Sequence, residues 1–167
     1  MLEGSINTVV FDLGNVLIPW DPRRLYLRLF RGDTKVTEWF LANVCNEEWN
    51  LRLDAGVPFS ENIAPLLQRF PQYADYIRAY DSRWHEMLGE PVGENVTIVR
   101  ELSKRGIRLF VLTNWPAEKF HYARERIPCI HLFEDMVISG DVKLVKPDLE
   151  IFRLLLKRNS LKAERTA

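Results

Sequence analysis

Three short polar groups in this chain combine side chains that could attack an electrophile and hold its oxygen atoms. In chain order they are Asp12, the pair Thr113 and Asn114, and Lys146. A carboxylate can act as a covalent nucleophile. A hydroxyl, an amide and an ammonium group can stabilise negative charge that develops on oxygen. The residue types therefore predict a site for group transfer to or from an anion, provided that the fold brings them together.

The elements that would position these residues are apolar, strand-like runs. The runs 8–11, 107–112 and 136–139 are short and rich in β-branched residues. Helical patterns at 94–104, at 117–125 and from Pro147 onward alternate with them, which favours an α/β fold with a Rossmann-like parallel sheet and helices on both faces. Ligands bind at the carboxyl ends of the strands in such a sheet. Asp12 and the Thr113–Asn114 pair directly follow two of the runs, and Lys146 lies downstream of the third, so we expect them at one edge.

A long helical stretch separates the first strand from the second. Its apolar spacing predicts helices over residues 22–30, 34–44, 47–53, 60–70 and 73–88. Thr34, Asn46 and Ser60 are expected to cap three of these helices. We therefore divide the chain into a core of residues 1–19 and 93–167 and an inserted helical bundle of residues 20–92.

Composition excludes some classes of protein. The 23 Lys and Arg residues balance the 23 Asp and Glu residues, so no net field attracts nucleic acid. Only two cysteines are present, which is too few for a disulfide framework. The N-terminal residues do not resemble a secretory leader, and no apolar stretch is long enough to span a membrane. These features predict a cytoplasmic protein that binds neither nucleic acid nor membrane, and they set no oligomeric state.

The polar groups and their contexts resemble the motifs of the haloacid dehalogenase superfamily. Residues 10–17, VFDLGNVL, are similar to its first motif, residues 112–114, LTN, to its second, and Lys146–Pro147 to its third. The helical insert after the first motif resembles the cap of the helical-cap branch. The match extends over essentially the whole chain, in the order and strand context of the family.

The resemblance implies a phosphatase that acts on a small phosphorylated metabolite such as a sugar phosphate. In the family's mechanism Asp12 would form an aspartyl-phosphate, which water then hydrolyses. Thr113 and Asn114 would bind phosphoryl oxygens, and Lys146 would offset negative charge. Mg²⁺ would bind Asp12 and the backbone carbonyl of Gly14. Trp20 and Trp115 directly follow the catalytic loops, so they are expected either to line the substrate pocket or to pack between cap and core.

The chain departs from the phosphatase pattern at Gly14. Most phosphatases of the superfamily carry an aspartate there as general acid and base, and glycine cannot transfer a proton. A subset of sugar-phosphate phosphatases shares the Asp-Leu-Gly-Asn sequence and has an aspartate a few residues later. Asp21 could take that role here, although its position before Pro22 also suits an N-cap of the first cap helix.

A second departure concerns the last motif. In the superfamily, a further strand begins about 20 residues after the Lys-Pro pair and supplies additional metal carboxylates. The resemblance implies that this strand would lie beside the first strand. Residues 159–167 contain no apolar run that could form this strand. We therefore expect the C-terminal strand of the core to be missing and the Mg²⁺ site to be incomplete.

Three functions are compatible with these residues. The first is the phosphatase, which the Gly14-Asn15 pair favours. The second is a 2-haloacid dehalogenase that uses the same Asp12 nucleophile on carbon, since that branch also lacks an aspartate two positions later. The third is a truncated, catalytically inactive family member.

Overall fold

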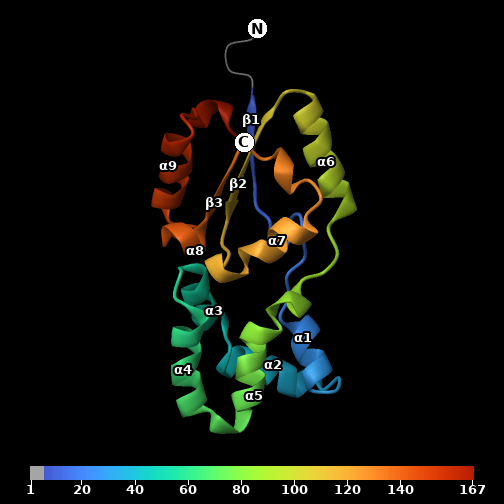
Figure 1. The fold of residues 1–167 in the computed structure, drawn as a ribbon, viewed down its shortest axis with the longest axis vertical. Helices are drawn as coiled ribbons and strands as arrows, with labels where there is room; N and C mark the ends of the chain where they lie inside the picture. The colour runs from blue at the N-terminus through green and yellow to red at the C-terminus, as the bar shows by residue number, and fades with distance from the viewer. Residues whose placement is uncertain (1–5) are drawn as a thin grey trace.

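The sheet forms the upper of two lobes that stack along the long axis of the molecule (Figure 1). The computed structural model describes residues 6–167, and the predicted range 1–19 therefore begins with five residues that lie outside the described ones. Within 6–167 one parallel sheet has the order β1-β2-β3, with β1 at Thr8–Phe11, β2 at Arg108–Thr113 and β3 at Asp135–Ile138. This confirms the predicted α/β class.

Helices cover both faces of the sheet. Helices α6 (Gly93–Lys104) and α7 (Phe120–Arg126) lie on one side of it, and α9 (Leu149–Arg158) lies on the other (Figure 1). Successive side chains of a strand point to opposite faces. Leu109 and Val111 of β2 accordingly belong to the larger hydrophobic core, whereas Phe110 and Leu112 pack with α9. Because both faces are buried, β2 is apolar without interruption from Leu109 to Leu112.

The lower lobe consists of helices from the segment between β1 and β2 (Figure 1). These helices are α1 Arg23–Leu29, α2 Thr34–Asn43, α3 Glu47–Asp54, α4 Phe59–Arg69 and α5 Ala74–Ser82. The remaining helical segments are α8 Ser139–Val142 and the 3-10 turns Pro71–Tyr73, Trp84–Met87, Ala117–Lys119, Ile130–Leu132 and Ala163–Arg165. We refer to residues 20–88 as the cap lobe.

The predictions of helix ends were partly wrong. Asn46 caps α3 as expected, because its side chain accepts a hydrogen bond from the Trp49 amide. The cap of α2 is Asp33 and not Thr34. The expected single helix over residues 73–88 is interrupted at Arg83, after which a 3-10 turn begins. This break lets the chain turn back to the core, where the Trp84 ring packs on Trp115 with the centroids 5.2 Å apart.

The apolar interior of the cap lobe is continuous with that of the core, and α3 contributes Leu53 to it. Leu53 is 1% exposed, whereas Leu51 on the same helix is 44% exposed. Removing a buried leucine side chain loses its burial energy and leaves a cavity, so Leu53→Ala is expected to lower the free energy of unfolding by about 2–5 kcal/mol. Leu51→Ala serves as the matched control and should change it by less than about 1 kcal/mol. Urea unfolding measures both; equal losses would contradict this packing.

Two crossings join the lobes, and they run side by side. Trp20 and Leu88 form an antiparallel bridge. The Gly89 amide donates to the Pro19 carbonyl at 2.8 Å, and the Asp21 amide donates to the Met87 carbonyl at 3.0 Å. The chain thus leaves the core and re-enters it through one short two-stranded ribbon.

The edge of β1 that faces away from β2 pairs with the last residues of the chain. Thr8 and Thr166 form a parallel bridge, the Ala167 amide donates to the Thr8 carbonyl at 3.0 Å, and the Val10 amide donates to the Ala167 carbonyl at 2.8 Å. These bonds involve backbone atoms alone and need no apolar run. The described C-terminal residues therefore occupy the position next to β1 without forming a full strand.

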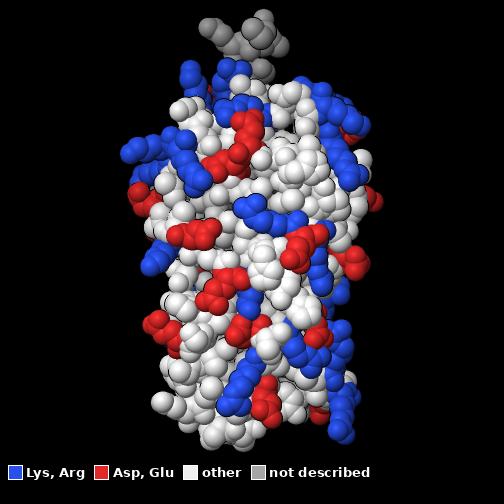
Figure 2. Space-filling model, in the orientation of Figure 1, with Lys and Arg blue, Asp and Glu red and all other residues white. Residues whose placement is uncertain are grey.

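The surface carries both signs of charge. Figure 2 shows Lys and Arg side chains interspersed with Asp and Glu over the visible face, in agreement with the formal net charge of zero. Among residues 6–167, no helix combines the length and the apolar character that a membrane crossing requires.

Candidate active site

The centre of the candidate site is an ion pair between Asp12 and Lys146. Asp12 directly follows β1, and its Oδ2 lies 2.7 Å from the Lys146 Nζ. Its Oδ1 accepts a hydrogen bond from the Leu13 amide at 2.8 Å. Lys146 also donates to the Leu112 carbonyl of β2 at 2.9 Å. The structure thus brings together two of the predicted residues, more than 130 positions apart in the chain, and fixes the orientation of the carboxylate.

The second predicted motif lies beside this pair. Thr113 is fully buried, and its hydroxyl has no hydrogen-bond partner within the described part of the chain. The Asn114 side chain is engaged at both ends, since it accepts from the Lys146 amide at 2.8 Å and donates to the Lys146 carbonyl at 3.1 Å. Asn114 therefore holds the backbone of Lys146 in place, a contact that the sequence did not predict. Its expected contact with a phosphoryl oxygen stays a prediction.

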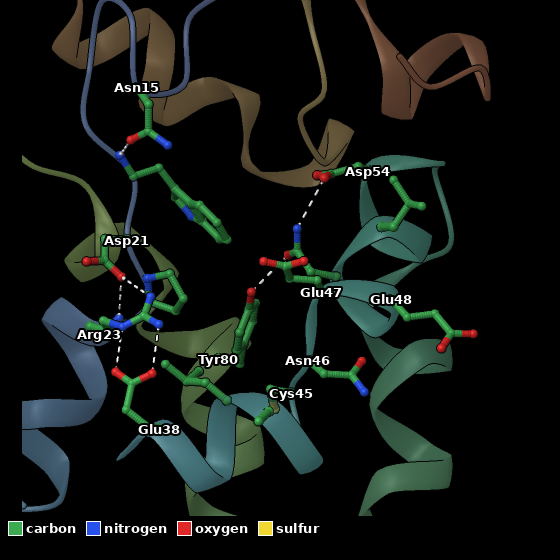
Figure 3. Close-up of a pocket in the computed structure, with 16 residues that line it drawn as sticks. Asn15, Asp21, Arg23, Glu38, Cys45, Asn46, Glu47, Glu48, Asp54 and Tyr80 are labelled. Atoms are coloured by element: carbon green, nitrogen blue, oxygen red, sulfur yellow. Dashed lines mark hydrogen bonds and ion pairs between the residues drawn. The ribbon is translucent and has the colours of Figure 1, made fainter. Parts of the chain in front are cut away.

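The loop after Asp12 folds back on itself. Gly14 bridges to Ile18, and Asn15 has a φ of 58°, in the left-handed region that asparagine tolerates. The Asn15 side chain accepts a hydrogen bond from the Trp20 amide at 2.9 Å, as Figure 3 shows. This bond ties the loop to the start of the cap lobe.

A small cavity of about 140 Å³ opens onto Asp12 between the two lobes. Its lining comes from the loops at the strand ends and from the cap: Asp12, Gly14, Asn15, Trp20, Asn50, Asp54, Trp84, Asn114, Trp115 and Pro116. The tryptophans at positions 20 and 115 line this cavity and also belong to, or pack against, the apolar cluster that joins the lobes. Their expected contact with substrate stays a prediction.

A larger chamber of about 820 Å³ lies within the cap lobe and shares Asn15, Trp20, Asn50 and Asp54 with the small cavity. Figure 3 shows the predicted proton-transfer residue Asp21 here, beside Arg23 and Glu38. The Asp21 Oδ1 accepts from the Arg23 amide at 2.9 Å, but the N-cap of α1 is Pro22, so the expectation of Asp21 as the N-cap was wrong. Asp21 lines the chamber but not the small cavity at Asp12.

Acidic side chains dominate the charge of the chamber. Asp21, Glu38, Glu47, Glu48 and Asp54 are among its lining residues, and Arg23 is the cationic residue among the described ones. The Arg23 guanidinium is already bonded to both Glu38 oxygens, at 2.6 and 2.8 Å. Burial raises the pKa of the Cys45 thiol, so this lining residue stays protonated and is no rival nucleophile.

Sequence reasoning missed Asp54, the last residue of α3. Its Oδ2 accepts a hydrogen bond from the Asn50 side-chain amide at 3.1 Å, and the Asn50 Oδ1 accepts one from the Tyr80 hydroxyl at 2.8 Å (Figure 3). Burial, and secondly the negative charge of Asp12, raise the pKa of the Asp54 carboxyl to about 7. One sequence signal could have indicated this polar face. Asn50 and Asp54 are four residues apart, so they lie on the same face of α3, next to the buried Trp49 and Leu53.

The cap lobe docks on the core at α8. The Ser139 hydroxyl donates to the Asp54 carbonyl at 2.6 Å and accepts from the Trp115 amide at 2.9 Å. Gly56 has a φ of 88°, and a Cβ atom there would lie 2.5 Å from the Gly140 carbonyl oxygen. The glycine at position 56 therefore permits a backbone approach that sets the distance between α3 and the core.

The described residues provide only some of the ligands for the magnesium ion that the family resemblance implies. Asp12 supplies one carboxylate, whose two oxygens contact Leu13 and Lys146, and the Gly14 carbonyl would be a second ligand. Among residues 6–167, no group of three or more His, Cys, Asp or Glu side chains could hold a metal. Mg²⁺ takes six oxygens, some of them from water or substrate phosphate, and the described residues would supply only part of this set.

Comparison with known proteins agrees with this arrangement. A sequence model described as "Haloacid dehalogenase-like hydrolase" matches residues 50–167. A sesquiterpene phosphatase of Aspergillus oryzae is 27% identical to this chain over 97% of it and 79% of its own length. A phosphorylated carbohydrates phosphatase of Thermotoga maritima is 29% identical over 96% of this chain and 74% of its own length.

Solved structures share the fold. A HAD family enzyme from Bacteroides thetaiotaomicron superimposes with a TM-score of 0.72 at 18% identity, covering 97% of this chain and 82% of that one. Another structure of that enzyme is a complex with magnesium and inorganic phosphate. An L-2-haloacid dehalogenase superimposes with a TM-score of 0.69 at 20% identity, covering 97% of this chain and 76% of that one. At these identities the likeness concerns the fold alone.

Proposed function

Since the chain belongs to the haloacid dehalogenase-like hydrolases, we propose that it is a phosphomonoester phosphatase that works through an aspartyl-phosphate. The observation that carries the proposal is the Asp12–Lys146 ion pair, whose carboxylate lines a small cavity at the carboxyl ends of the strands. The two phosphatases that match over most of the chain support it.

In the proposed reaction the Asp12 carboxylate attacks the phosphorus atom. The bond from phosphorus to the leaving-group oxygen breaks, and that oxygen takes up a proton. Water then attacks the phosphorus, the bond from phosphorus to Asp12 breaks, and inorganic phosphate leaves. Lys146 offsets negative charge on Asp12 and on the phosphoryl oxygens, and the buried Thr113 hydroxyl is available to donate to one of them.

We propose the same residue ranges as the functional units, with the core in 1–19 and 93–167 and the cap in 20–92. We also propose Mg²⁺ as the cofactor, as in the structural relative that binds it. The metal is assigned no step, because the described residues supply only part of its coordination. The two cysteines are free and buried, which supports the proposed cytoplasmic location.

The chamber favours a substrate whose leaving group carries no negative charge. Its acidic residues repel a carboxylate, and the Arg23 guanidinium is paired with Glu38. A neutral, hydroxyl-rich group can instead donate hydrogen bonds to these carboxylates. We therefore propose a sugar phosphate or a similar neutral phosphomonoester as the substrate.

The test is a panel of phosphomonoesters assayed for release of inorganic phosphate, with Mg²⁺ and with a chelator. We expect release from neutral sugar phosphates to exceed release from phosphorylated carboxylic acids. Halide release from a 2-haloacid, without phosphate release from any ester, would support the dehalogenase. Absence of all turnover would support an inactive family member.

The close contact between the cap lobe and α8 at Gly56 gives a further prediction. Gly56→Ala places a methyl group against the Gly140 carbonyl and should displace the end of α3 from the core. Misplacement by about 1 Å can cost about 10²-fold in rate, so kcat/KM for phosphate release is expected to fall by that order. Steady-state kinetics measures it.

Gly32→Ala is the matched control for this substitution. Gly32 has a φ of 84°, close to that of Gly56, but a Cβ atom there would meet nothing within 4 Å. Both variants carry the same backbone strain, so both should lose stability. Only Gly56→Ala should lose activity; an equal loss of activity in Gly32→Ala would contradict the role of the contact with Gly140.

A further inference from the structure

The site lacks an assigned proton donor, because glycine stands two residues after Asp12. Asp54 supplies a carboxyl group from the cap lobe to the same small cavity. We infer that Asp54 is the general acid that protonates the leaving group and the general base that activates water, an inference that rests on the proposed phosphatase function.

The position of Asp54 relative to Asp12 fits this role. Asp12 reaches the cavity from the core, and Asp54 reaches it from the cap lobe. In phosphoryl transfer the attacking and leaving oxygens lie roughly in line on opposite sides of phosphorus. A phosphoryl group attacked by Asp12 therefore directs its leaving oxygen away from the core, toward the cap lobe. Asp54 is the carboxyl group that the cap lobe contributes to the lining of this cavity.

Hydrogen bonds hold Asp54 at both its backbone and its side chain. The Ser139 hydroxyl donates to its carbonyl at 2.6 Å, so the core fixes the end of α3. Asn50 donates to the Oδ2 atom at 3.1 Å and is itself oriented by the Tyr80 hydroxyl. This leaves Oδ1 to carry the transferred proton. Because the Ser139 contact joins cap and core, docking of the cap lobe on the core positions the Asp54 carboxyl group at the small cavity.

The surroundings of Asp54 suit proton transfer near neutral pH. Its pKa is raised to about 7, first by burial and second by the charge of Asp12. A general acid works best when its pKa lies near the working pH. The ionisable groups that share a lining with Asp54 include Asp12, itself paired with Lys146, and Tyr80 and Glu47. The Lys143 side chain lies next to Gly56, two residues after Asp54.

Asp54 gives up one proton and regains one proton in each turnover. In the first step the proton leaves Asp54 for the leaving-group oxygen as the bond from phosphorus to that oxygen breaks. In the second step the Asp54 carboxylate takes a proton from water as the water oxygen bonds to phosphorus and the bond from phosphorus to Asp12 breaks. Asp54 ends protonated and Asp12 ends ionised, as at the start.

The leaving group provides the test. The para-nitrophenolate group leaves without protonation, whereas the alkoxide of glycerol phosphate needs a proton. Asp54→Asn should therefore lower kcat/KM for glycerol phosphate by about 10²–10⁴-fold and leave kcat/KM for para-nitrophenyl phosphate nearly unchanged. Its kcat on the aryl ester should fall after a burst of nitrophenol, because water attack on the aspartyl-phosphate lacks its base.

Matched variants separate this role from others. Asp75→Asn replaces an exposed aspartate of the cap lobe, and it should behave like the wild type on both esters. Asp21→Asn tests the acid predicted from the sequence, and it should not distinguish the two leaving groups. Asp54→Ala with added formate should regain part of its activity on glycerol phosphate. Thermal unfolding of each variant reports whether it is folded.

Two different failures can be told apart. Equal losses of kcat/KM on both esters in Asp54→Asn, without rescue of Asp54→Ala by formate, would overturn the inference and leave the phosphatase in place. A leaving-group dependence in Asp21→Asn in place of Asp54→Asn would also overturn it. Wild-type protein that releases no phosphate from either ester would overturn the proposed function itself.

Discussion

Asp12→Asn is expected to abolish phosphate release, with kcat at least about 10⁴-fold below the wild type. The amide that replaces the carboxylate is a poor nucleophile, and it removes the negative charge that Lys146 contacts at 2.7 Å. The variant should stay folded, since the Leu13 amide can still donate to the amide oxygen at this position. Steady-state release of phosphate measures the loss, and mass spectrometry of quenched wild-type protein should detect a phosphoryl group on Asp12.

The control for this substitution is Asp141→Asn. Asp141 is an exposed aspartate on α8 of the core, outside the small cavity and the chamber. We expect it to retain wild-type kinetics. If Asp12→Asn kept more than a few per cent of the activity while folded, another group would have to be the nucleophile.

Lys146→Met is expected to lower kcat/KM by about 10²–10³-fold, the scale of losing one well-placed group that stabilises transition-state charge. Methionine keeps an unbranched apolar side chain but cannot offset charge on Asp12 or on the phosphoryl group. Lys146→Arg should restore little, because Nζ must reach both Asp12 and the Leu112 carbonyl. Kinetics on a good aryl ester measures the chemical step.

Lys157→Met on the exposed face of α9 provides the matched control and should be neutral. A loss in Lys157→Met as large as that in Lys146→Met would indicate a nonspecific effect of removing positive charge. A loss confined to KM in Lys146→Met would assign the lysine to substrate binding alone.

The sequence was sufficient for the part of the site that lies on the sheet. Asp12 and Lys146 follow from the rule that chemistry gathers at the carboxyl ends of parallel strands, and the structure places them 2.7 Å apart. The engagement of Asn114 with the Lys146 backbone was not predictable, because it depends on how two loops far apart in the chain meet.

The cap lobe was less predictable for a physical reason. Its helices follow from apolar periodicity, but the break at Arg83 depends on packing of Trp84 against Trp115 in the other lobe. Asp54 reads in the sequence as an ordinary residue at the end of a helix. Its raised pKa comes from tertiary burial and from Asp12, 42 positions earlier in the chain. Local propensity carries no information about either of these effects.

The ribbon that joins the lobes has a consequence for modularity. Because the Gly89 amide is bonded to the Pro19 carbonyl at 2.8 Å, the two ends of the cap lobe lie in contact. An inserted segment whose ends meet can be exchanged without stretching its host. A graft of another helical cap between positions 19 and 89 should thus leave the sheet and the Asp12–Lys146 pair intact while replacing the chamber. The nucleophile lies in the core and the chamber lies in the cap lobe, so the cap lobe, and with it the selectivity, can change while the nucleophile is kept.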